Sequence, residues 1–180
     1  MLKKILCLLA ALCLLPVFAL ADPTAEPGSE GIAPLTEADF LFTFEDAEYA
    51  LGGEVASLVA AVEQKYGAAM ELVEAESCMF TGKDREYSNA DLVFGTYPAG
   101  KDGADVIETI MVLSEAFMTA RGACVGMTLD EVAELYGDNF TLDYDQMIYQ
   151  MGENGPMLVF NIDLESDEVV CWSLLKNTTK

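Results

Sequence analysis

One stretch of this chain occurs twice, and that duplication constrains the fold more than any other feature. The stretch from Val55 to Gly67 returns seventy positions later, from Val125 to Gly137. Each copy carries an apolar stripe at helical spacing, ends in a tyrosine and a glycine, and is followed by strand-like sequence. Because self-similarity at a fixed offset indicates duplicated units, we expect an α+β fold. In it, two tandem α-β-β-β units form one curved antiparallel sheet with the helices on one face.

The period of the apolar residues predicts the individual elements. Thr128 and Glu131 have the spacing of a capping box, and Gly67 is placed to end the first helix in a left-handed conformation. A change of alternation near Asp145 predicts a β-bulge. Helices are expected at 54–66 and 128–136, and strands at 40–46, 72–81, 86–97, 105–113, 140–151, 157–164 and 168–175.

The N-terminus has the pattern of a signal peptide. Lys3 and Lys4 precede an apolar run, and Ala19-Leu20-Ala21 is a typical cleavage site. The run of about 14 residues is shorter than the ~20 that a membrane span needs. We therefore expect a secreted protein with no membrane span after cleavage near Ala21. The expected divisions are a signal peptide (1–21), a flexible acidic leader rich in proline and glycine (22–39), and a single domain (40–176) of two repeats (about 40–115 and 122–176).

The charge of the chain is strongly negative. Cleavage would remove Lys3 and Lys4 but no acidic residue, which leaves 31 acidic against seven basic side chains, a net charge near −24. Nucleic acids and anionic membranes carry the same sign and would repel the protein. The sequence therefore excludes nucleic acid as a partner and favours a protein of the envelope or the extracellular medium.

Three cysteines remain in the mature chain, so they cannot all pair with one another. Export permits disulfides. Cys124 precedes the second predicted helix and Cys171 lies in the last predicted strand of the same unit. We predict a disulfide between Cys124 and Cys171, with Cys78 as a small buried apolar residue, although other pairings stay open because spacing does not determine connectivity.

The absence of histidine removes most catalytic chemistry. Ser-His and Cys-His nucleophile pairs and histidine zinc ligands are excluded. A hydrolase based on two carboxylates stays open as a third hypothesis. The acidic turn with Asp163, Glu165, Asp167 and Glu168 has several carboxylates that could converge on a calcium ion. It lacks, however, the length and the central glycine of an EF-hand loop. We predict no catalytic, cofactor or metal site.

These features resemble a known fold family. A signal peptide followed by tandem helix–glycine–strand units, with Gly126-Met-Thr-Leu-Asp-Glu-Val132 and Tyr136-Gly137, resembles the β-lactamase-inhibitor-protein-like (BLIP-like) fold. Lipoproteins of the BamE/SmpA kind carry one such unit, but this chain lacks a suitable lipidation cysteine. Ser77-Cys78-Met-Phe80, Gly82-x-Asp84 and Thr96-Tyr97-Pro98 are similar to small exported proteins of anaerobic Firmicutes. In the inhibitor family the concave face of the sheet binds a partner enzyme. The resemblance covers about 40–175, but no contact motif of that family matches this sequence residue by residue. It therefore implies a fold but no target.

Several predicted strands are apolar on both sides, which is unusual for a sheet covered on one face. Val93 and Tyr97, and likewise Met157 and Val159, face away from the side expected to lie under the helices. An uncovered apolar face marks a partner surface, and we predict these four residues to be that surface. The alternative is structural cover by the 40–44 strand, by a loop or by a second copy.

The leading hypothesis is an exported, non-enzymatic binding protein that uses this sheet face against a protein partner, with inhibition of that partner as one form of it. The second hypothesis is a structural or assembly factor of the cell envelope.

Overall fold

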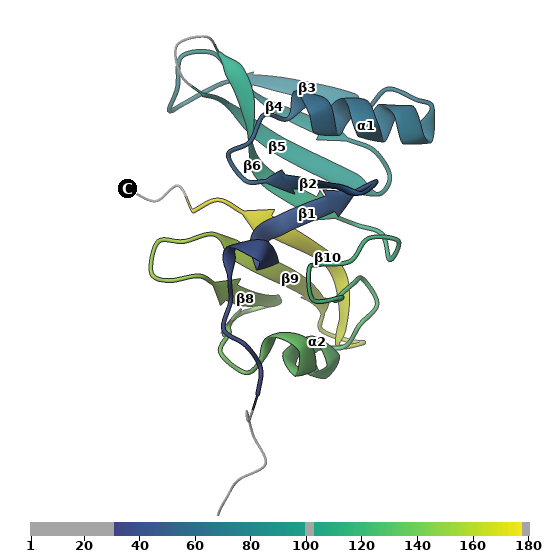
Figure 1. Cartoon of the computed structure of the whole chain (residues 1–180), viewed down its shortest axis with the longest axis vertical. Coiled ribbons are helices and arrows are strands. Elements are labelled where there is room, and N and C mark those ends of the chain that lie inside the picture. Colours follow the sequence, from purple (N-terminus) through teal and green to yellow (C-terminus); the bar gives the residue numbers. More distant parts are fainter. Residues whose placement is uncertain (1–30, 100–102, 178–180) are drawn as a thin grey trace, which may run out of the picture. The chain divides into compact units, whose positions relative to one another are not determined.

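The computed structural model describes residues 31–99 and 103–177. Eight strands form one antiparallel sheet in the order β3-β4-β5-β6-β10-β9-β8-β7, and β1 pairs with β2 in a separate hairpin (Figure 1). The elements are a 3-10 helix η1 (Glu37–Phe40), helices α1 (Ala56–Tyr66) and α2 (Leu129–Tyr136), and strands β1 (Leu41–Phe44), β2 (Ala47–Ala50), β3 (Glu71–Glu76), β4 (Lys83–Ser88), β5 (Leu92–Ala99), β6 (Ala104–Val112), β7 (Thr141–Asp143), β8 (Gln146–Gln150), β9 (Met157–Asp163) and β10 (Glu168–Leu175).

The predicted α+β fold of two α-β-β-β units is wrong. The described residues are 43% strand and 16% helix, and a two-stranded hairpin accompanies the eight-stranded sheet. Each α-helix is followed by four strands and not by three, because two of the predicted long strands contain a turn. The described part of the chain is therefore mostly antiparallel sheet with two short α-helices.

Local turn chemistry divides those two predicted strands. Asn89 accepts hydrogen bonds through Oδ1 from the amides of Asp91 (2.9 Å) and Leu92 (2.8 Å), an Asx-turn that separates β4 from β5. Tyr144 adopts φ 55° in the tight turn between β7 and β8, where a bulge was predicted. Asparagine is a common turn residue, whereas tyrosine at positive φ is rare, so the second turn is the harder one to foresee.

The two copies of the repeated stretch lie in different surroundings. Tyr66 is 40% exposed, and its hydroxyl donates to Asp91 at 2.5 Å. Partial burial and then this carboxylate raise the pKa of Tyr66 to about 12. Its counterpart Tyr136 is buried and packs against Tyr149, with ring centroids 5.2 Å apart. The shared sequence therefore produces two helices but not two equivalent packing arrangements.

A single core lies between the sheet and the elements on one of its faces. Figure 1 shows α1 over β3–β6, α2 beside β8–β10, and the β1–β2 hairpin between the two helices. Phe42 from the hairpin lies against Trp172 and Phe94, with centroids 6.2 and 6.3 Å apart. Leu58 of α1 and Val132 of α2 are fully buried in the same cluster. The hairpin thus fills the space that the two helices leave uncovered.

Part of the predicted flexible leader is attached to the domain. Arg121 donates to the carboxylate of Asp39 (Nε–Oδ1 2.6 Å) and to the carbonyls of Ala33 and Pro34. Residues 33–39 therefore have fixed partners that their composition did not predict. Residues 22–30 and the predicted signal peptide lie outside the described residues. Within the described ranges, neither α-helix is long and apolar enough to cross a membrane.

The turn between β1 and β2 offers a stability test. Glu45 and Asp46 both have positive φ, 49° and 64°, as a two-residue hairpin turn of type I′ requires. Glycine adopts this conformation without steric cost. We expect Asp46→Gly to raise the free energy of unfolding by roughly 0.5–1 kcal/mol and Asp46→Ala to lower it, as measured by urea denaturation. An Asp46→Ala variant as stable as Asp46→Gly would contradict this turn geometry.

Candidate partner-binding face

Both α-helices of the described residues lie on the same face of the sheet. Side chains of successive residues in a strand point to opposite faces. On β10, Trp172 and Leu174 lie in the core with the helices, so Ser173 and Leu175 point to the other side. We call that other side the open face.

Strand pairing aligns the open-face side chains in two rows that cross the sheet. Residues directly opposite each other on neighbouring strands have Cβ atoms about 5 Å apart, so their side chains touch. The central row consists of Val93, Met111, Ser173, Val159 and Ile148, from β5, β6, β10, β9 and β8. The second row consists of Glu86, Gly95, Thr109, Leu175, Met157 and Gln150, from β4, β5, β6, β10, β9 and β8.

Three of the four predicted surface residues fall in these rows. Val93 and Met157 are half-buried, so part of each side chain is available for contact. Val159 is only 3% exposed, because its neighbours in the central row enclose it. The structure thus places the three on one face, with β6 and β10 between Val93 and the other two, and leaves Val159 little contact area of its own.

Tyr97, the fourth predicted residue, lies at one end of the open face and has a different environment. The turn between β3 and β4 places Phe80 on its ring, with centroids 4.8 Å apart and nearly parallel planes. The Nζ atom of Lys176 donates to its hydroxyl at 2.5 Å. Tyr97 is consequently 9% exposed, while Phe80 is 42% exposed. At this end of the face, Phe80 is therefore the accessible aromatic residue.

The β1 strand does not cover the open face. Phe40, Phe42 and Phe44 are all buried in the core on the opposite side of the sheet. Among the described residues, the β3–β4 turn is the one segment that stacks an aromatic ring on an open-face side chain, at Tyr97. The alternative of cover by residues 40–44 is therefore excluded, and half-buried apolar side chains remain along the central row.

Two central residues of the rows were not among the predicted surface residues. Met111 and Ile148 are half-buried members of the central row. The run Ile110-Met111-Val112 is apolar on both sides, the same signal that identified Val93 and Met157. Ser173 interrupts the row, and its hydroxyl is buried without a hydrogen-bond partner in the described part of the chain.

The predicted disulfide is not formed. Cys78, Cys124 and Cys171 are all free, and Cys78 is exposed where burial was predicted. Cys171 lies opposite Asn161, which donates to its sulfur at 3.2 Å, and burial raises the pKa of this thiol. The segment of Cys124 instead leads into α2 on the covered face. Membership of one predicted unit did not bring the two sulfur atoms together.

The acidic turn considered for calcium has a structural role. Oδ1 of Asp163 accepts from the amides of Glu165 (2.7 Å) and Ser166 (3.2 Å), which fixes the β9–β10 turn. Within residues 31–99 and 103–177, no three acidic or cysteine side chains are grouped to hold a metal ion.

A groove of about 360 Å³ lies on the covered side, between α1 and strands β4 and β6. Its walls include Val59 and Tyr87, and its carboxylates include Glu54, Glu63 and Asp105. Asp105 already binds the guanidinium of Arg85 at 2.6 Å. This groove is separate from the predicted surface residues, which lie on the open face.

Comparison with known protein families, with curated proteins and with solved structures finds no match. The resemblance to the BLIP-like fold therefore stays a prediction.

Proposed function

We propose that this protein is an exported binding protein that holds a protein partner against the open face of its sheet. The observation that carries the proposal is the central row of the open face. In it half-buried Val93 adjoins half-buried Met111, and half-buried Ile148 adjoins Val159 on the other side of Ser173. An apolar surface of this kind loses contact with water when a partner covers it, which favours association.

The surroundings of the central row suit a protein partner. The second row adds Leu175 and Met157 beside polar side chains such as Thr109 and Gln150. Protein interfaces combine an apolar centre with a polar rim. Methionine adapts its shape to different partners because its side chain is unbranched and flexible. The net charge of −22 opposes nucleic acid, whose phosphates carry the same sign.

Charged replacements in the rows test the proposal. Val93→Glu and Met157→Glu are each expected to weaken partner binding at least tenfold, because a buried, unpaired carboxylate opposes association. The bait is the purified wild-type protein, immobilised and exposed to medium and envelope extract of the producing cell. Each variant is then immobilised in the same way. A captured protein counts as the partner only if neither variant captures it, and if both variants have the melting temperature of the wild type.

Leu142→Glu is the matched control. Leu142 is 57% exposed in β7 of the same sheet, and it lies opposite Met147, which is buried in the core of the covered face. Its replacement introduces the same charge at an exposed apolar residue of the sheet but leaves the open face intact. Equal capture by wild type, Met157→Glu and Leu142→Glu would refute the proposed surface.

A further inference from the structure

The acidic end of the open face contains a hollow, which we call the Gly95 hollow. It has a volume of about 300 Å³ and is lined by Val73, Ala75, Asp84, Glu86, Gly95 and Glu108. Gly95 belongs to the second row, between Glu86 of β4 and Thr109 of β6. A side chain is missing at this one position of the row, so the surface is indented there.

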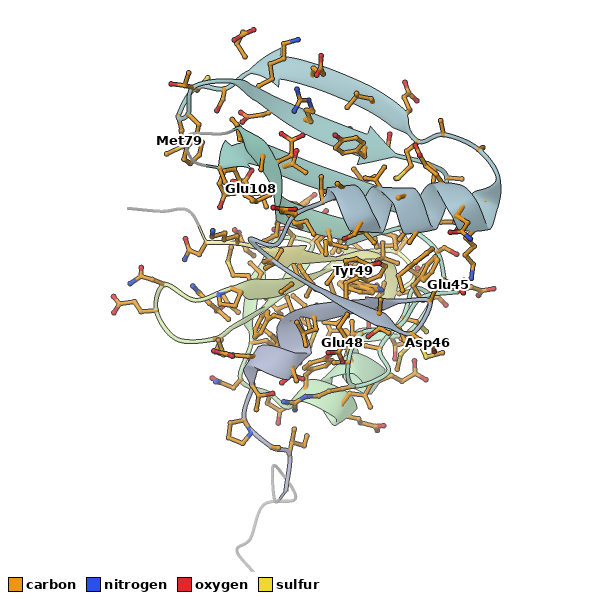
Figure 2. The ribbon with its side chains drawn as sticks, turned by 45° about the horizontal axis from the view of Figure 1, so that its top comes forward. Glu45, Asp46, Glu48, Tyr49, Met79 and Glu108 are labelled. Atoms are coloured by element: carbon orange, nitrogen blue, oxygen red, sulfur yellow. The ribbon has the colours of Figure 1, made fainter. Side chains whose placement is uncertain are left out.

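A β-bulge shapes the far wall of the hollow. The pairing of β5 with β6 shifts between Gly95 and Thr96, so Glu108 has no direct partner on β5. Glu108 therefore lies beside Gly95 and lines the hollow. Figure 2 labels Glu108 on the part of the sheet remote from the acidic hairpin tip with Glu45 and Asp46.

The carboxylates of the hollow lack cationic partners. Oδ1 of Asp84 is buried and makes no hydrogen bond within the described residues. No described cation lies within ion-pair distance of Asp84, Glu86 or Glu108. A buried carboxylate oxygen without a partner is unfavourable. The hollow is thus a negatively charged indentation whose three carboxylates have no described ion-pair partner.

Among the described lining residues, the basic one is Arg85, and its charge is directed away from the hollow. Arg85 contributes to the lining, but alternation directs its side chain to the covered face. There its guanidinium binds Glu74 (Nε–Oε1 2.7 Å) and Asp105 (Nη1–Oδ2 2.6 Å). These two hydrogen-bonded carboxylates raise the pKa of Arg85 further, which keeps the guanidinium charged and occupied.

We propose that the Gly95 hollow receives the guanidinium group of an arginine side chain from the protein partner. This inference rests on the proposed function and adds to it the chemical group of the partner that the face recognises. A guanidinium is planar and has five N–H donors, so it can serve several carboxylates at once, and its aliphatic stem can lie on Val73 and Ala75. No described set of three carboxylates is grouped to hold a metal ion, so an extended organic cation fits better.

The position of the hollow links it to the rest of the face. The second row leads from Gly95 through Thr109 and Leu175 to Met157. An arginine seated at Gly95 would therefore bring the neighbouring residues of the partner over the apolar rows. The expected recognition element is an arginine flanked by apolar residues.

The test uses two peptides that differ only in charge. Acetyl-Leu-Arg-Leu-amide is titrated into the purified protein and followed by the backbone amide NMR signals of Glu86, Gly95 and Thr96. Acetyl-Leu-citrulline-Leu-amide is nearly isosteric with it but neutral. We expect saturable binding of the arginine peptide and binding of the citrulline peptide that is weaker by about tenfold or more. Equal binding of both, or no saturable shift with either, would overturn the proposal.

Variants locate the binding to the hollow. Asp84→Asn and Glu108→Gln are each expected to weaken the arginine peptide by about five- to tenfold. Gly95→Leu places a side chain in the hollow without changing the charge, and we expect it to abolish binding. An added Cβ would lie 3.4 Å from its nearest neighbour, Thr109, which is an ordinary van der Waals contact. Glu134→Gln, on the exposed side of α2, is the control and should bind as wild type. Loss of binding in Glu134→Gln as large as in Asp84→Asn would mean a general charge effect and refute the site.

The two proposals can fail separately. If the Met157→Glu variant loses its partner but the arginine peptide does not bind, the open face is an interface without this anchor. If the peptide binds as expected but Met157→Glu still captures every protein that the wild type captures, the hollow is a cation site and the proposed function is wrong.

Discussion

Replacing Arg121 with methionine is expected to lower the free energy of unfolding by about 3–5 kcal/mol. Asp39 is 4% exposed, and Arg121 holds its carboxylate through two hydrogen bonds, Nε–Oδ1 at 2.6 Å and Nη2–Oδ2 at 2.9 Å. Methionine preserves much of the aliphatic stem but leaves this carboxylate buried without a cation. The measurement is urea denaturation of the purified protein at neutral pH.

The double variant Asp39→Asn with Arg121→Met is the control. It removes the unpaired charge, so we expect it to be more stable than Arg121→Met alone, because the penalty comes mainly from the isolated carboxylate. A single variant within about 1 kcal/mol of wild type would show that the pair behaves as an exposed ion pair and would contradict the burial of Asp39.

The same pair makes stability depend on pH in the acidic range. The hydrogen bonds from Arg121 hold the pKa of Asp39 below its ordinary value of 3.8. A carboxyl whose folded pKa is depressed contributes its full stability above the unfolded pKa and loses it as the pH falls through the folded pKa. We expect wild type to lose this contribution below about pH 4, whereas the Asp39→Asn/Arg121→Met double variant should lack this part of the slope.

Arg121 also explains why the boundary of the domain could not be predicted. Its guanidinium lies over the ring of Tyr136, 5.0 Å from the centroid, and reaches the carbonyls of Ala33 and Pro34. The two carbonyl contacts join residues more than eighty positions apart, and no local pattern in 31–39 predicts them. The proline- and glycine-rich composition predicted flexibility, but Arg121 binds Ala33, Pro34 and Asp39, and Leu35 packs against the core.

Local signals were more informative where one short stretch determines the structure. The capping box of α2 is confirmed, since the hydroxyl of Thr128 accepts from the Glu131 amide and Glu131 accepts from the Thr128 amide. Gly67 ends α1 at φ 66°, as predicted. Each of these features needs only three or four neighbouring residues, so sequence spacing suffices to identify it.

The candidate face was predictable only in part. Val93 and Met157 were identified because their strands are apolar on both sides, and this signal depends on alternation alone. The Gly95 hollow depends on a register shift between β5 and β6 and on carboxylates from β4 and β6. The fold class failed for a related reason, since turns at Asn89 and Tyr144 changed which residues pair.

Phe42→Ala is the second replacement with a large expected effect, a loss of about 3–5 kcal/mol in the free energy of unfolding. Phe42 is fully buried, and its ring lies 6.2 Å from Trp172 and 6.1 Å from Phe117. A two-stranded hairpin is marginally stable alone, so β1 and β2 depend on this contact. Removing the ring should open a cavity and loosen the hairpin from the sheet.

Trp172 reports this change directly because it is the only tryptophan of the chain. Its emission should shift to longer wavelength in Phe42→Ala as water approaches the indole, alongside the loss of stability in urea. Thr43→Ala is the matched control, since Thr43 is the next residue of the same strand and is exposed; we expect a change within about 0.5 kcal/mol. If Phe42→Ala left both the emission and the stability unchanged, the hairpin would not be part of the core, and the covered side of the sheet would be accessible between α1 and α2.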